Sequence, residues 1–60
     1  MNATPTRFAC LGYTKVLPGM WRFIDTSTGH AVGPIYRTKA ELLADLQDYA
    51  ERAGWSQILA

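Results

Sequence analysis

The chain contains 60 residues, carries a formal net charge of +1 and has one cysteine and one histidine. A chain this short forms a single domain with a small core, which buries only about 60% of its unfolded surface. One cysteine excludes an intramolecular disulfide, and one cysteine with one histidine cannot provide four zinc ligands. No stretch is apolar and long enough for a secretory signal or a membrane span. We therefore expect a complete, cytoplasmic protein with no membrane partner.

The first two thirds of the chain predict short strands joined by tight turns. Residues 1–6 are polar and contain a proline, and we expect them to form a flexible leader. The three predicted strands, within residues 7–37, are residues 7–16, 20–25 and 31–37. Pro18 followed by Gly19 is typical of a turn that reverses the chain, and the next loop ends in Gly29. Pro34 has no amide hydrogen to donate, which favours an edge position for the third strand.

Residues 38–54 predict an α-helix with a start signal and a stop signal. Thr38 and Glu41 match a capping box, in which each side chain accepts a hydrogen bond from the other residue's backbone amide. Gly54 can adopt the left-handed conformation that ends a helix. Six apolar residues recur at helical spacing and predict the face that packs on the sheet: Leu42, Leu43, Leu46, Tyr49, Ala50 and Ala53. Residues 55–60 form a tail, and we expect Trp55 to pack back on the last helical turn.

Together these elements predict an α+β fold, a three-stranded antiparallel β-meander with one C-terminal α-helix packed across one face. With tight turns, Lys15 pairs with Arg22 in the first hairpin. In the second hairpin Phe23 pairs with Val32. Alternation along the strands then divides the side chains between two faces. The face toward the helix is predicted to hold Phe8, Cys10, Val16, Trp21, Phe23, Val32, Pro34 and Tyr36. The open face is predicted to hold Arg7, Leu11, Tyr13, Lys15, Met20, Arg22, Ile24, Ile35 and Arg37.

This open face mixes apolar, aromatic and cationic side chains, and we predict that it binds a partner. The candidate binding residues are Arg7, Tyr13, Lys15, Met20, Arg22, Ile24, Ile35 and Arg37. Lys15 and Arg22 would repel each other across the hairpin, and an anion or a partner carboxylate would relieve the repulsion. Alternatively, both side chains extend into water. The apolar residues either form an interface or are covered by the tail, through Trp55, Ile58 and Leu59.

Charge is unevenly distributed along the chain. Residues 1–38 carry four cations and one carboxylate, a net charge of +3, whereas residues 39–60 have a net charge of −2. The helical acidic residues Glu41, Asp45 and Asp48 share one face at helical spacing. They predict either an ordinary solvated surface or, as an alternative binding site, an acidic strip that docks on a basic groove.

No arrangement of residues predicts catalysis. Cys10 lies within a predicted strand and His30 at a loop end about 10 Å away, beyond the reach of a nucleophile and its base. No metal-binding spacing and no glycine-rich phosphate loop is present. We therefore predict that the protein is not an enzyme and uses no metal or cofactor.

A resemblance to DNA-binding families rests on the second predicted strand and the segment after it. Residues 21–25 read WRFID, glycines occur at positions 29 and 33, and YRT at residues 36–38 leads into the helix. This pattern, over residues 7–53, resembles the DNA-binding domains of the AP2 type and the arm-binding domains of tyrosine integrases. In those families arginines and tryptophans on the sheet read the major groove of DNA. The resemblance therefore implies DNA-contacting roles for Arg7, Lys15, Trp21, Arg22 and Arg37.

The size of the chain and its lack of catalytic residues are also similar to short inhibitors encoded by phages, plasmids and integrated elements, including anti-CRISPR inhibitors. Such proteins cover a surface of a larger host complex, for which a rigid patch suffices. We therefore predict a small non-enzymatic binding protein from a phage or mobile element, which occupies a surface of a host protein or nucleoprotein complex. The alternatives are a small DNA-binding or DNA-accessory domain using the same sheet face, and a homodimer formed through that face.

Overall fold

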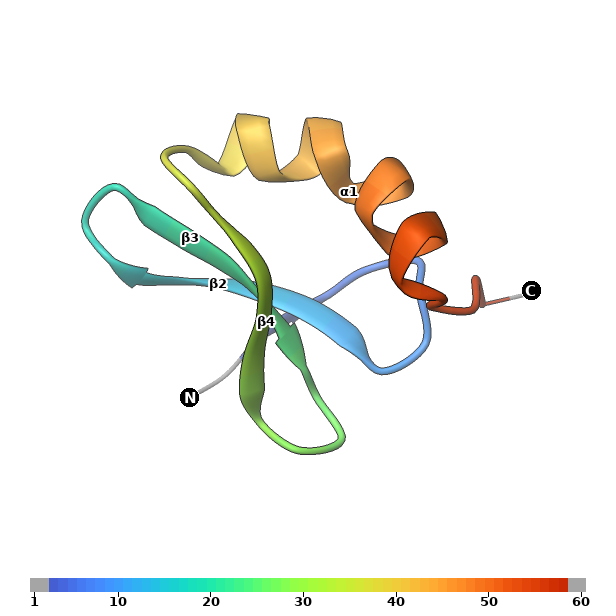
Figure 1. Ribbon diagram of the computed structural model, residues 1–60. Coiled ribbons are helices and arrows are strands. Elements are labelled where there is room, and N and C mark those ends of the chain that lie inside the picture. The colour runs from blue at the N-terminus through green and yellow to red at the C-terminus, as the bar shows by residue number, and fades with distance from the viewer. Residues whose placement is uncertain (1–2, 59–60) are drawn as a thin grey trace.

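A four-stranded antiparallel sheet, covered on one face by one helix, forms the described part of the computed structural model, residues 3–58 (Figure 1). The elements are β1 (Thr4–Pro5), β2 (Leu11–Leu17), β3 (Met20–Asp25), β4 (His30–Tyr36) and α1 (Lys39–Ala53). The strand order is β1-β2-β3-β4, so each strand pairs with the next along the chain. The predicted α+β fold with a C-terminal helix is confirmed, and the sheet has one strand more than the three expected.

The helix α1 begins and ends where the sequence predicts. Thr38 is extended, and its hydroxyl accepts a hydrogen bond from the amide of Glu41 at 3.1 Å, as an N-cap requires. The Glu41 carboxylate accepts from the amide of Arg37 at 3.3 Å, one residue earlier than predicted. At the other end Gly54 has φ +87, and the amide of Trp55 donates back into the last turn at 2.8 Å. Trp55 is half-buried and packs against the core.

The buried face of α1 contains fewer residues than the six predicted. The residues of this helix that are buried are Leu42, Leu46 and Ala50, with Tyr49 half-buried beside them. Leu43 and Ala53 are exposed, contrary to the prediction. A spacing of four residues keeps side chains along one line of the helix, and a single twisted sheet supports only a narrow stripe.

The register of the β2–β3 hairpin differs from the predicted one by one residue. Lys15 pairs with Trp21 and not with Arg22, because a β-bulge lies between Lys15 and Leu17. A shift by one residue moves each preceding side chain of β2 to the opposite face of the sheet. The residues corrected in this way, which lie on the helix side, are Leu11, Tyr13 and Lys15. The predicted repulsion between Lys15 and Arg22 is therefore wrong, since the two side chains lie on opposite faces.

Strand β4 lies at the edge of the sheet, as Pro34 predicts, and a second bulge interrupts it. Phe23 pairs with its predicted partner, but residues 33–35 then occupy a stretch where β3 has a single residue. Gly33 has φ +74 in this bulge, and an added Cβ would lie 2.7 Å from the ring of Tyr49. Only glycine combines this conformation with such a close approach, so Gly33 allows α1 to pack on the sheet edge.

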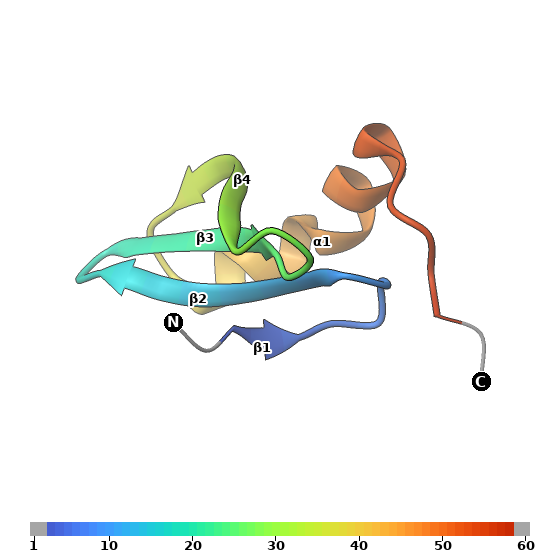
Figure 2. The same ribbon diagram turned by 90° about the horizontal axis from the view of Figure 1, so that it is seen from below.

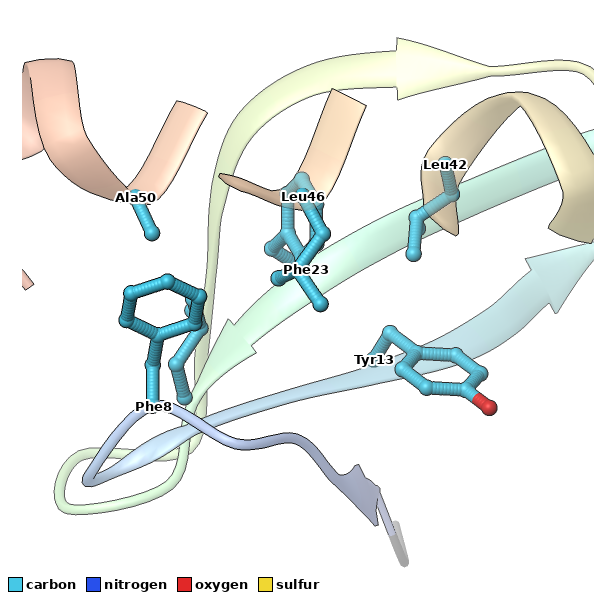
Figure 3. Close-up of a cluster of buried hydrophobic side chains, with 7 residues drawn as sticks. Phe8, Tyr13, Phe23, Leu42, Leu46 and Ala50 are labelled. Carbon is cyan, nitrogen blue, oxygen red and sulfur yellow. The ribbon is translucent and has the colours of Figure 1, made fainter. Parts of the chain in front are cut away.

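The core lies between the sheet and α1, where side chains from both layers point toward one another (Figure 3). Its buried residues are Phe8, Leu11, Tyr13, Phe23, Leu42, Leu46 and Ala50. Phe23 is fully buried and stacks on Tyr49, with ring centroids 4.7 Å apart and an interplanar angle of 7°. Tyr36 meets the Phe23 ring edge-on at 5.5 Å. These aromatic pairs add to the stabilisation from burial alone.

Residues 3–10 are more ordered than the predicted leader and first strand suggest. Thr4 and Pro5 pair with β2 as strand β1 (Figure 2). A turn precedes β2, and Cys10 lies in this turn with φ +60 and an exposed side chain. The prediction of a buried Cys10 within a strand is therefore wrong, because the chain reverses direction at that point.

The C-terminal tail pairs with residues 7–9 and does not cover the open face. The amide of Ala9 donates to the carbonyl of Ser56, and the amide of Ile58 donates to the carbonyl of Arg7, both at 2.8 Å. This pairing leaves Ile58 57% exposed, so its predicted covering role is wrong. Leu59, assigned the same role, lies outside the described residues.

Candidate interaction surface

One end of the molecule gathers cations and exposed aliphatic side chains. Here the turn of the β2–β3 hairpin projects past the start of α1, while the helix C-terminus lies at the opposite end (Figures 1 and 2). We define this tip end by Lys15, Leu17, Met20, Arg22, Ile35, Arg37 and Lys39. It carries four of the six cations in the sequence, and the opposite end carries Arg7 and Arg52. The sequence predicts a basic sheet and an acidic helix, whereas in the fold the tip end also receives one cation, Lys39, from the helix.

The structure divides the eight predicted sheet-face residues among several locations. Those on the open face are Met20, Arg22, Ile24 and Ile35. Tyr13 is only 8% exposed and belongs to the core, and Lys15 lies on the helix side of the sheet. Arg7 donates to the side chain of Gln47 in α1 at 2.7 Å. Arg37 lies in the connection between β4 and α1.

Contacts within the protein hold the Arg22 side chain against the sheet. Its Nη2 donates to the carbonyl of Gly33 at 2.8 Å, and its Nε is buried without a hydrogen-bond partner among the described residues. Ile24 beside it is 6% exposed. The open face therefore presents a partly covered, restrained guanidinium and not a row of free cations.

An aliphatic patch lies on the open side of the tip. It consists of Leu17, Met20 and Ile35, of which Leu17 is 59% and Ile35 56% exposed. Leu17 pairs with Met20 across the hairpin, and alternation before Tyr36 directs Ile35 to the same side. The sequence pattern did not indicate Leu17 as a binding residue, because it lies between the predicted strands 7–16 and 20–25. The available signal was a leucine immediately before a Pro-Gly turn, at the projecting end of a hairpin.

The helix side of the tip carries a lysine–aromatic cluster, formed by Tyr13, Lys15, Trp21 and Lys39. The Tyr13 and Trp21 ring centroids are 6.2 Å apart, and Lys15 is the cross-strand neighbour of Trp21. Lys39 places its Nζ 5.9 Å from the Tyr13 ring centroid, within the range of a cation–π interaction. Trp21 is half-buried against the core, and both lysines are exposed. Lys39 was not among the predicted site residues.

The predicted acidic strip is partly engaged in contacts within the fold. Glu41 accepts from a backbone amide at the helix start, as described above. Asp45 accepts a hydrogen bond from the Tyr36 hydroxyl at 2.6 Å and lies 3.7 Å from Nη2 of Arg52. Burial, together with this bond to Asp45, raises the pKa of Tyr36. Asp48 is exposed. Glu41 and Asp45 are thus engaged in contacts within the fold, so less of the strip is available to a partner than the sequence implies.

The remaining features of the described chain concern cavities, metals and membranes. Across residues 3–58 there is no pocket, and no group of three or more His, Cys, Asp or Glu residues is placed to hold a metal ion. No helix in this range is both long and apolar enough to cross a membrane. The candidate site is therefore a surface.

Comparisons with protein-family models, with curated proteins and with solved structures found no match for this chain. The function is therefore inferred from the chemistry of the tip end.

Proposed function

We propose that this protein is a small non-enzymatic binding protein that occupies a surface of a larger protein or nucleoprotein complex through its tip end. The observation that supports this proposal is the aliphatic patch, where Leu17 and Ile35 are mostly exposed beside several cations. Exposed apolar side chains that cluster are typical of interaction sites. Cations around them steer association toward an acidic partner surface. Occupation of such a surface would inhibit whatever else binds there.

The size of the molecule is compatible with this mode of action. A stable interface buries about 800 Å² on each partner. The whole chain has an accessible surface of 4013 Å², so such an interface would use about one fifth of it.

Duplex DNA binding through the open face has less support. Proteins bind duplex DNA largely through several free cations that reach phosphates on one surface. On the open face Arg22 donates to Gly33 within the fold, and Lys15 lies on the other side of the sheet. An aliphatic patch at this position fits a protein surface better than a phosphate backbone.

Site-specific photo-crosslinking tests the proposal with a matched pair of positions. A photoreactive residue is placed at Leu17, 59% exposed, or at Ile58, 57% exposed at the opposite end, and each protein is mixed with extract of its native cells. We expect a discrete, larger product from position 17 only. Lys15→Glu with Arg37→Glu should reduce its yield about tenfold, since both cations then repel an acidic partner. Equal products from both positions, or none from position 17, would contradict the proposal.

A further inference from the structure

The helix side of the hairpin carries chemistry different from that of the aliphatic patch. We propose that the lysine–aromatic cluster binds single-stranded nucleic acid, with Lys15 and Lys39 contacting phosphates and Trp21 stacking on a base. This site is separate from the aliphatic patch, and its test needs no protein partner.

The geometry supplies both components of such a site within one continuous set of contacts. From α1, Lys39 reaches the ring of Tyr13, and Tyr13 lies against Trp21 with a centroid distance of 6.2 Å. Trp21 then neighbours Lys15 across the hairpin. One ammonium group therefore lies against the aromatic pair, and a second lysine neighbours the pair across the hairpin. Sites for single strands combine positive charge along the backbone with aromatic side chains on which bases stack.

The two lysines are free to bind an external anion. Within residues 3–58 neither forms an ion pair, and the cluster itself contains no carboxylate. The nearest acidic residue in sequence, Glu41, accepts a hydrogen bond from the amide of Arg37. A phosphate approaching the cluster would thus meet two lysines that form no ion pair among residues 3–58.

The aromatic pair favours nucleic acid over an acidic peptide. Carboxylates pair with lysines but offer no flat ring to stack on Trp21, whereas every nucleobase does. A single strand is favoured over a duplex because paired bases have their faces covered by their neighbours. The exposed Asp48 further along α1 would repel a long polyanion, so we expect a contact of only a few nucleotides.

An amide NMR titration with a short oligothymidylate tests the site directly. We expect shifts at Tyr13, Lys15, Trp21 and Lys39. The indole N–H of Trp21 should move while that of Trp55 stays in place. The affinity should fall with salt at a logarithmic slope of about −0.7 for each phosphate neutralised. An oligoglutamate of matched charge serves as the comparison ligand, and it should bind at least tenfold more weakly because it cannot stack.

Substitutions separate the contribution of base stacking from that of the lysine charges. Trp21→Leu keeps an apolar side chain but removes stacking, and should weaken binding about tenfold, whereas Trp21→Phe should retain most of it. Lys15→Gln and Lys39→Gln should each weaken binding about threefold and lower the salt slope by one phosphate. Arg52→Gln, at the opposite end, should change nothing. If the amide spectrum shows that Trp21→Leu does not fold, Trp21→Phe and the two lysine variants still test the proposal.

Three outcomes would overturn the proposal. The first is the absence of shifts at low salt. The second is equal binding of oligoglutamate, which would leave only a general anionic attraction. The third is shifts spread equally over Arg7 and Arg52 at the opposite end. None of these outcomes depends on the crosslinking result at Leu17, so failure of one proposal is distinguishable from failure of the other, although Lys15 takes part in both.

Discussion

The helix-covered core and the tip end contain the same kinds of apolar side chain in opposite environments. In the core Phe23 is fully buried between the sheet and α1, whereas Leu17 at the tip is 59% exposed. The difference arises from the face of the sheet that each side chain occupies, because α1 covers only the face that holds Phe23, whereas Leu17 lies on the open face. Apolar residues under the helix stabilise the fold, and those on the open face of the tip remain available to a partner.

The largest contrast should come from truncating one apolar side chain in each region. Phe23→Ala should reduce the free energy of unfolding by about 3–5 kcal/mol. The total stability of a chain this size is about 3–9 kcal/mol, so this loss is a large fraction of the total. Leu17→Ala should change it by less than about 0.5 kcal/mol. Urea denaturation followed by tryptophan fluorescence measures both, and similar losses would contradict the division into two regions.

A second prediction concerns the closest approach between α1 and the sheet. Gly33→Ala should cost about 3 kcal/mol, since the new methyl group meets the Tyr49 ring at 2.7 Å while φ stays at +74. Gly29 is the matched control, with φ +80 and no atom within 4 Å of an added Cβ. Gly29→Ala should therefore cost about 1 kcal/mol, from backbone strain alone. Equal losses in thermal denaturation would show that α1 does not press on β4 at this point.

A third, smaller effect should come from the hydrogen bond that joins β4 to α1. Tyr36→Phe removes the bond to Asp45 and should cost about 1 kcal/mol at neutral pH. Burial and the Asp45 bond raise the pKa of Tyr36 above its ordinary 10.0 in the folded state. The associated stability is therefore complete below pH 10.0 and is lost as the pH rises above it. Urea midpoints across this range should fall less steeply in Tyr36→Phe, and parallel curves would contradict the assignment.

The smallest effect should lie in the exposed β3–β4 loop, away from both regions. The Asp25 carboxylate accepts hydrogen bonds from the Ser27 hydroxyl at 2.6 Å and the Ser27 amide at 3.0 Å. The hydroxyl bond contributes most to lowering the pKa of Asp25 below 3.8. This contribution to stability is present above pH 3.8 and lost as the pH falls through the folded-state value. The stability of Asp25→Asn should depend slightly less on pH in the acid range. A carboxyl NMR titration that gave Asp25 its ordinary pKa would contradict this.

The helix was predictable because its signals are local. The capping pair Thr38 and Glu41 and the closing Gly54 lie within one turn of the ends they define, so no distant contact could override them. The hairpin register was not predictable in this way. A β-bulge near Val16 requires no particular residue, yet it moves every preceding side chain of β2 to the other face.

The same bulge explains why the candidate site was only partly predictable. Met20, Arg22 and Ile24 were placed correctly on the open face, since β3 has the predicted bounds. Ile35 was also placed correctly, because the bulge in β4 adds two residues and so preserves the alternation. Lys15 and Tyr13 were assigned to the wrong side. The ring of Tyr13 meets Lys39 from the helix, so the lysine–aromatic cluster depends on a contact between distant segments that local patterns do not contain.

Both edges of the sheet are poor templates for further strands. On one side β4 is kinked at Gly33 and carries Pro34, which has no amide hydrogen, while on the other side β1 is only two residues long and ends in Pro5. Unprotected edges recruit strands from other molecules and lead to aggregation. The kink that admits Tyr49 thus also interrupts the hydrogen-bonding row along β4, so the protein should resist edge-to-edge assembly even at high concentration.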